Sequence, residues 1–230
     1  MPAEVTESIL FYIRNDKETM PGIASLTAHL LLSLENRASG CWKNIPRDVF
    51  IATMGCFSRF VKEHKCSYHI YGYDRAFWTL RQANAKLFRL GELEYERMDR
   101  DAAHIHIHIP SDAKLEPEKL NDSIHQAKEF FTMYFPENSN SDYMLETWLL
   151  SPELKHLLPP DSRILHFQDA FDITETDPMA NDYLEWVFKI PGEKLEAVSL
   201  QDLPEDTTLQ KNMKQYILNG GHIGNASGTL

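Results

Sequence analysis

The sequence predicts an α+β protein in which a helical N-terminal region precedes a mixed sheet flanked by helices. Apolar residues recur at helical spacing through the first third of the chain, whereas from Arg89 onward a strand-like alternation begins. At 230 residues the chain can bury roughly 70 to 75% of its unfolded surface, so it can fold without covalent cross-links. We expect a helical domain over residues 1–88 and a sheet domain over residues 89–230.

The composition excludes several classes of function. A formal net charge of -11 argues against a protein that grips nucleic acid by its phosphates. No apolar run reaches the ~18 to 20 residues that span a bilayer, and no basic segment leads into an apolar one at the N-terminus. Cys41, Cys56 and Cys66 lack metal-ligand spacing and are expected to be reduced, mostly buried thiols, as in a cytoplasmic protein.

Three helices are expected in the N-terminal region. The first carries the apolar residues from Ile23 to Leu34 and breaks at Gly40. The second runs from Pro46 to about His64, since proline is favoured at a first helical position. The third begins with Asp74 as its N-cap and continues to about Leu87.

From Arg89 onward the spacing of apolar residues changes from a helical to a strand-like period. A strand over Leu93 to Met98 follows Gly91, and the alternating segment from His104 to Ile109 forms its antiparallel partner. Pro117 begins a helix of about five turns.

The last third is expected to hold three more strands and two helices. Tyr143 to Leu150 is apolar on both faces, which is typical of a central strand. Ser151 is the expected N-cap of a short helix that Pro159 and Pro160 end. The remaining elements are strands over residues 163–171 and 183–190, a final helix with Thr207 and Gln210 as a capping box, and a stop at Gly220 and Gly221.

Five segments carry a resemblance to a known family. They are Asp74 to Thr79, Arg89 to Glu96, His108 to Pro110, Glu146 to Leu150, and Leu203 to Gln210. From about Asp48 to Gly221 the chain resembles a bacterial family of acyltransferases that pairs a helical N-acyltransferase-type domain with a GNAT-like domain. The resemblance implies acetyl-CoA or another acyl-CoA as co-substrate, bound between a strand and the long helix that follows it, where the next strand splays away. It further implies transfer to an amine of a small molecule or peptide.

Such a transfer needs a base for the amine proton. Glu146 is the first candidate, because an acid within an apolar strand has its pKa raised by desolvation. His108, beside the loop that precedes the long helix, is the second. Each also has a purely structural explanation, as a hydrogen-bonded strand residue.

The start of the long helix is the expected cofactor site. The candidates for contact with CoA are Ser111, Lys114, Lys119 and Ser123, and those for substrate contact are Trp148 and His106. However, residues 111–121 contain no glycine, and the acidic side chains of Asp112, Glu116 and Glu118 would repel a pyrophosphate at that helix start. The tyrosine that often protonates the leaving thiolate is absent from residues 151–158, where His156 lies.

Two other functions stay open. His104, His106 and His108 share one strand face and could offer imidazoles to a metal, with His166 or Glu146 as a further ligand, although a polar strand face explains the pattern as simply and no metal is expected. The second alternative is a protein that binds a ligand but catalyses no reaction, with Trp148, Trp186 and Tyr183 lining its pocket.

Overall fold

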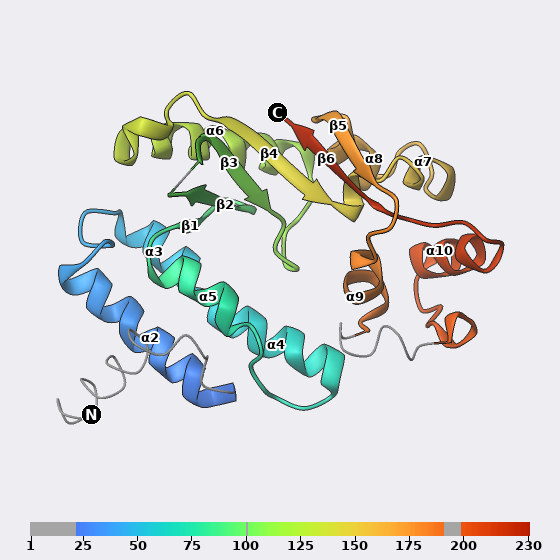
Figure 1. Cartoon of the computed structure of the whole chain (residues 1–230), viewed down its shortest axis with the longest axis horizontal. Helices are drawn as coiled ribbons and strands as arrows, with labels where there is room; N and C mark the ends of the chain where they lie inside the picture. The colour runs from blue at the N-terminus through green and yellow to red at the C-terminus, as the bar shows by residue number, and fades with distance from the viewer. Residues whose placement is uncertain (1–21, 100, 191–198) are drawn as a thin grey trace.

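The computed structural model describes residues 22–99, 101–190 and 199–230. Its elements follow one another from the helices of the N-terminal region to a final strand (Figure 1). In chain order they are α2 (Gly22–Ser39), α3 (Arg47–Met54), α4 (Cys56–Tyr68), α5 (Ala76–Ala83), β1 (Leu87–Leu90), β2 (Leu93–Met98), β3 (Asp101–His108), α6 (Pro117–Tyr134), the 3-10 turn η1 (Pro136–Asn138), β4 (Asp142–Thr147), the 3-10 turn η2 (Trp148–Leu150), α7 (Leu154–Leu157), α8 (Arg163–Gln168), β5 (Asp172–Asp177), α9 (Asp182–Phe188), the 3-10 turn η4 (Leu200–Asp202), α10 (Thr208–Leu218) and β6 (Asn225–Thr229).

The six strands form one mixed sheet in the order β1-β2-β3-β4-β6-β5. Only β3 and β4 pair in parallel, and the other neighbours are antiparallel. Helices α2 to α5 lie along one side of the sheet, and α6 lies on the other (Figure 1). The α+β class with a helical N-terminal region is therefore confirmed.

Alternation along β2 explains why the sheet is covered on both faces. Leu93 and Tyr95 point toward α6, where the Ser123 hydroxyl bonds to both of them. Glu94 and Glu96 point the other way, toward arginines of α4 and α5. Because successive side chains of a strand leave opposite faces, β2 joins the two helical layers.

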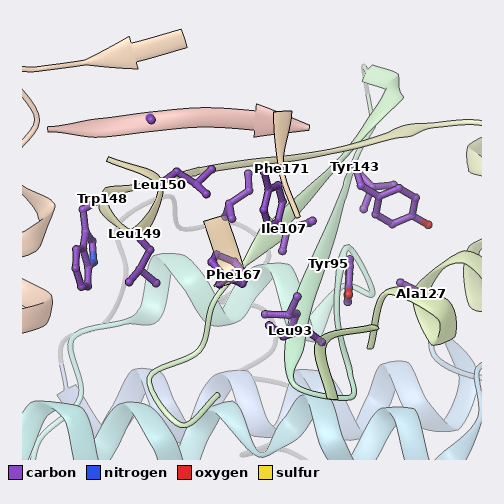
Figure 2. Close-up of a cluster of buried hydrophobic side chains, with 14 of the residues drawn as sticks. Leu93, Tyr95, Ile107, Ala127, Tyr143, Trp148, Leu149, Leu150, Phe167 and Phe171 are labelled. Carbon is purple, nitrogen blue, oxygen red and sulfur yellow. The ribbon is translucent and has the colours of Figure 1, made fainter. Parts of the chain in front are cut away.

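The main core fills the α6 side of the sheet (Figure 2). It combines inward-facing residues of β2, β3 and β4 with aromatic and apolar side chains from α6, η2 and α8. Its members include Leu93, Tyr95, Ile107, Ala127, Tyr143, Trp148, Leu149, Leu150, Phe167 and Phe171. A smaller core around Phe57 and Phe60 of α4 lies among the N-terminal helices.

Gly91 in the β1–β2 turn packs directly against α6. Its φ is +64°, and a Cβ there would lie 3.0 Å from the Cα and Cβ of Ser123. We expect Gly91→Ala to lower the free energy of unfolding by about 2 to 3 kcal/mol, through backbone strain and overpacking together. Gly220→Ala is the matched control, since Gly220 also has a positive φ but nothing within 4 Å of its added Cβ. If urea unfolding shows the same loss of free energy for Gly91→Ala and Gly220→Ala, packing against Ser123 does not contribute.

The second expected helix is divided in the structure. Residues 46–64 form not one helix but α3 and α4, which meet at Gly55. The backbone of Gly55 stays in the right-handed helical region, so the two helices remain nearly continuous.

The third helix also starts later than expected. It begins at Ala76, its cap position is Arg75, and no side chain caps it. The Asp74 carboxylate instead lies 3.9 Å from Nε of Arg75. The helix ends at Ala83, and Leu87 begins β1, so the expected domain boundary between residues 88 and 89 falls inside that strand.

The two strands predicted over residues 163–171 and 183–190 are helices instead. The Ser162 hydroxyl accepts a hydrogen bond from the Ile164 N–H and caps α8. In α9 the buried side chains of Tyr183, Leu184 and Phe188 recur at helical spacing. Both runs are short and apolar, and such runs fit either periodicity until their packing partners decide.

The remaining corrections lie around β4. This strand ends at Thr147, whose hydroxyl accepts from the Leu149 N–H and starts η2. Ser151 does not cap α7 with its side chain; its backbone carbonyl accepts from the Leu154 N–H at 3.2 Å. Strands β1, β5 and β6 were not predicted.

Several local predictions are confirmed. Helix α10 carries the complete Thr207/Gln210 capping box, and Gly220, with a φ of +86°, follows its end. All three cysteines are free thiols, but only Cys56 is buried, so the expectation of mostly buried thiols is wrong for Cys41 and Cys66. None of the helices in the described ranges has the length and apolar character that crossing a bilayer requires.

Candidate functional site

A cavity of about 490 Å³ opens where β3 and β4 stop pairing. The two parallel strands are in register from His104 opposite Asp142 to His106 opposite Met144. Beyond that point the ends of both strands line the cavity, with residues 107–111 on one side and 145–149 on the other. The opening between the strands is therefore the floor of the candidate site.

The N-terminal helices supply a second wall. Arg59 and Phe60 of α4 and Trp78 of α5 line the cavity, and Trp186 of α9 borders it as well. The site thus lies between the helical region and the sheet, and needs both.

His108 is the histidine of the cavity wall, and it has a carboxylate partner. Its Nε2 lies 2.9 Å from Oε2 of Glu96, and the Trp78 ring contacts the imidazole edge to face, with centroids 4.9 Å apart. Burial acts to raise the pKa of Glu96, but the hydrogen bond and charge of His108, with Arg81 at 3.0 Å, outweigh it and leave that pKa below its usual value. An ionised Glu96 can only accept, so Nε2 of His108 donates and Nδ1 carries the free lone pair of the neutral ring.

Glu146 also lines the cavity, but not in the predicted environment. Its side chain is exposed on β4, although its neighbours Leu145 and Trp148 are buried. The desolvation that motivated its choice as base is therefore absent.

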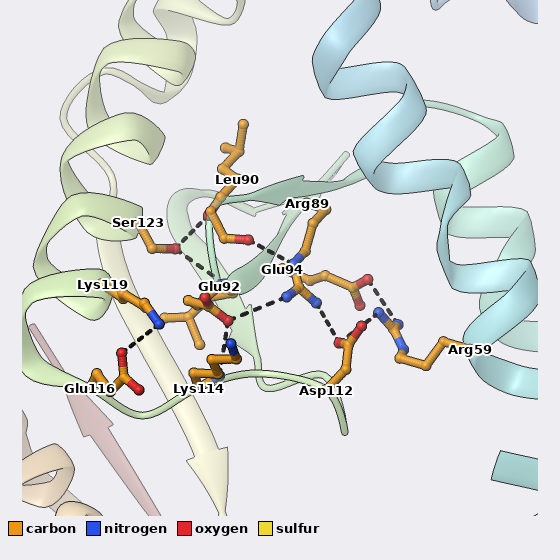
Figure 3. A network of polar contacts seen from close by, with 12 residues as sticks. Arg59, Arg89, Leu90, Glu92, Glu94, Asp112, Lys114, Glu116, Lys119 and Ser123 are labelled. Atoms are coloured by element: carbon orange, nitrogen blue, oxygen red, sulfur yellow. Dashed lines mark hydrogen bonds and ion pairs between the residues drawn. The ribbon is translucent and has the colours of Figure 1, made fainter. Parts of the chain in front are cut away.

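The β3–α6 loop is held by a polar network (Figure 3). The Ser111 hydroxyl donates to Glu63 of α4, and the backbone N–H of Lys114 donates to Glu92 at 2.9 Å. Asp112 lies 2.9 Å from Arg89 and 3.8 Å from Arg59. The same two arginines also pair with Glu63, Glu94 and Glu92, so the network orders the loop around Asp112 but leaves it rich in acidic groups.

The N-terminus of α6 has no side-chain cap; its cap residue is Glu116, and Glu118 lies in its first turn. Lys119 pairs with Glu116 at 2.5 Å, and Arg163 of α8 lies 3.9 Å from the same carboxylate. An uncapped 18-residue helix leaves backbone N–H groups and the positive end of its dipole available to an anion.

Comparison with known families accounts for this architecture. Residues 12–85 match the N-acyltransferase N-terminal domain, and residues 87–230 match the GNAT-like C-terminal domain. The chain belongs to this acyltransferase family. No curated protein gave a significant match.

The fold of this chain is similar to that of an acyltransferase whose structures have been solved in complex with its ligands. The complex with decanoyl-CoA is 25% identical with a TM-score of 0.81, and the alignment covers 98% of this chain and 75% of that one. The complex with decanoyl-CoA and teicoplanin is 23% identical, with the same TM-score and coverage. The GNAT-like fold expected from the resemblance is confirmed.

Two residues that the sequence predicted for the site of this family member, Ser123 and His106, lie away from the cavity. Ser123 is fully buried on the α6 side, where its hydroxyl donates to the Leu90 carbonyl and accepts from the Leu93 N–H at 3.1 Å. It ties the β1–β2 hairpin to α6 and is not available to a ligand in the cavity. His106 does not line the cavity either; burial, followed by the nearby His108, lowers its pKa.

The aromatic candidates divide in the same way. Trp148 and Trp186 line the cavity, whereas Tyr183 is buried within α9 and does not. Trp148 is 8% exposed, so it contributes to the core and to the cavity wall at once.

The histidine strand does not assemble a metal site among the described residues. His104 pairs with Asp101 at 2.8 Å, and His108 with Glu96. His166 and His156 are exposed on α8 and α7. Within the described ranges no group of three or more His, Cys, Asp or Glu side chains is placed to hold a metal ion.

Sequence reasoning missed Arg59, Trp78 and Glu96. Arg59 pairs with the buried Glu94 at 2.8 Å across 35 residues of sequence, and its guanidinium lies over the Phe60 ring. One signal in the sequence could have indicated these residues. Glu94 and Glu96 are two residues apart in β2, so their side chains leave the same face of the strand, and that face is covered by helices. Buried acids require partners, but their identity depended on tertiary packing.

Proposed function

We propose that this protein transfers an acyl group from an acyl-CoA to an amine of a small molecule or peptide, with His108 as general base. The observation that carries the proposal is the His108–Glu96 pair in a cavity between two diverging strands. The imidazole would take the proton of the attacking amine while the new C–N bond forms. The C–S bond then breaks, the CoA thiolate leaves and takes up a proton from water, and His108 returns its proton to solvent.

The Glu96 partner suits His108 to this role. A carboxylate that accepts from Nε2 selects the tautomer whose Nδ1 is basic, and it stabilises the imidazolium that forms. The Trp78 ring packs against the imidazole edge to face and restrains it further. Glu146 has no comparable partner and is exposed, so His108 is the better-supported base.

Binding of acyl-CoA would use both the opening between the strands and the start of α6. The decanoyl-CoA complexes of the structural neighbours support this class of co-substrate. We propose that Lys114, Lys119 and Arg163 hold phosphate oxygens near the uncapped N–H groups of α6, with Ser111 beside them at the cavity. This replaces the glycine-rich loop that the sequence lacks.

Isothermal titration calorimetry tests the proposal directly. We expect acetyl-CoA and free CoA to bind in the micromolar range, more weakly at higher salt because part of the attraction is between phosphates and lysine or arginine. Release of free CoA thiol on addition of an amine then reports transfer. If acetyl-CoA binds but no amine leads to release of CoA thiol, a ligand-binding protein with this fold would be favoured over an enzyme.

The cation cluster yields a separate prediction. The double variant Lys119→Ala/Arg163→Ala is expected to bind CoA about 5- to 20-fold more weakly and with a smaller salt dependence, since two phosphate contacts are lost. Lys211→Ala on α10 is the matched control, because this exposed lysine lies outside the cavity wall and the start of α6. An unchanged affinity in the double variant would move the phosphate site elsewhere.

A further inference from the structure

Most charged side chains of the cavity wall are already engaged with protein atoms. Those with a hydrogen bond or ion pair are Arg59, Glu63, Arg75, Glu94, Asp182 and Lys189. Among the residues that the structure describes, Glu146 is the charged wall residue for which no such partner exists. Its side chain is exposed and lines the cavity.

The position of Glu146 relative to His108 is set by strand register. His106 and Met144 are the last paired residues of β3 and β4, and His108 and Glu146 each follow two residues later. Because side chains repeat every two residues, both project from the same face on opposite sides of the gap. Pairing of Glu146 with Ser227 of β6 fixes the backbone position from which the carboxylate projects.

A free carboxylate across the gap from the base attracts positive charge. The reacting amine must lose its proton before it attacks, so an ion pair with that nitrogen would weaken along the reaction. A second ammonium or guanidinium keeps its charge throughout and would stay bound.

We infer that Glu146 binds a second cationic group of the acceptor, and that the enzyme prefers acceptors carrying a positive charge close to the reacting amine. This inference rests on the proposed function and names the acceptor class within it. Diamines, amino sugars with more than one amine, and lysine- or arginine-containing peptides share this chemistry. Glu146 is then a specificity residue, not the base.

Three amines of matched length test the inference: 1,5-diaminopentane, pentylamine and 5-aminopentanoate. Binding to the full chain is measured by calorimetry without acyl-CoA, and transfer is measured by thiol release with acetyl-CoA. The wild type is expected to bind the diamine about fivefold more tightly than pentylamine, and 5-aminopentanoate most weakly. Glu146→Gln should abolish the preference, and Glu146→Lys should reverse it.

Glu175→Gln is the control, since Glu175 is exposed on the edge strand β5 and does not line the cavity; it should retain the wild-type order. Equal affinity for the three amines, no measurable binding of the diamine, or a preference that survives Glu146→Gln would overturn the inference. A preserved charge preference in binding without any thiol release would instead count against the proposed transfer, so the two failures are distinguishable.

Discussion

Replacing His108 with alanine is expected to lower kcat/KM for acyl transfer by about 100- to 10,000-fold, because a positioned general base contributes on that scale. The dissociation constant for acetyl-CoA should change little, since the imidazole is assigned to the amine proton and not to the phosphates. Thiol-release kinetics give the first quantity and calorimetry the second. The pH profile of the residual activity should lose the rise that reports deprotonation of the base.

His104→Ala is the matched control for this variant. It removes an imidazole from the same strand and the same face, but His104 pairs with Asp101 and does not line the cavity. Its kcat/KM should stay within about twofold of the wild type. Glu96→Gln should give an intermediate loss, because an amide can still hold the ring but stabilises the imidazolium less. If His104→Ala and His108→Ala lose activity equally, the loss reflects strand structure and not base catalysis.

Loss of Arg59 is expected to have the largest effect on stability. Its side chain is 9% exposed and pairs at 2.8 Å with Glu94, which is 2% exposed, so Arg59→Ala leaves a buried carboxylate without its cation. Burial acts to lower the pKa of Arg59, but the charge of Glu94 and its hydrogen bond raise it above the ordinary value, so the guanidinium stays charged. We expect the free energy of unfolding to fall by about 3 to 5 kcal/mol, measured by urea titration.

A second variant separates the lost charge pair from the lost packing. Arg59→Met combined with Glu94→Met should recover most of the stability, since apolar residues of similar volume often replace a buried ion pair at little cost. Lys86→Ala breaks an ion pair with Asp99 whose side chains are 42% and 57% exposed, and it should cost less than about 1 kcal/mol. An Arg59→Ala loss as small as that of Lys86→Ala would show that water reaches Glu94.

Local patterns predicted the elements whose signals lie within one stretch of sequence. The β2–β3 hairpin, the Pro117 start of α6 and the capping box of α10 each depend on residues a few positions apart. Helices α8 and α9 did not follow from such patterns. Their short apolar runs suit a strand or a helix equally, and packing decided between them.

Strand β6 shows the same limit more sharply. Its sequence, from Asn225 to Thr229, has little β-propensity, yet it pairs with β4 on one side and β5 on the other. A Cβ at Gly228 would lie 3.1 Å from Cβ of Phe171, so a small residue is required where the strand passes the segment between α8 and β5. The strand forms because two partners complete its hydrogen bonds, and no single segment records this.

By itself, the sequence determined the class of the fold and its family resemblance, and it predicted the place of the candidate site, since the histidine strand, its loop and the long helix are contiguous. Only the tertiary structure decided which residues make that site. It brought Glu96 and Trp78 to His108, moved Ser123 to the opposite face, and left Glu146 solvated and unpaired in the described chain. The reason is physical: the charge state and availability of a side chain depend on burial and on partners distant in sequence, and neither can be read from neighbouring residues.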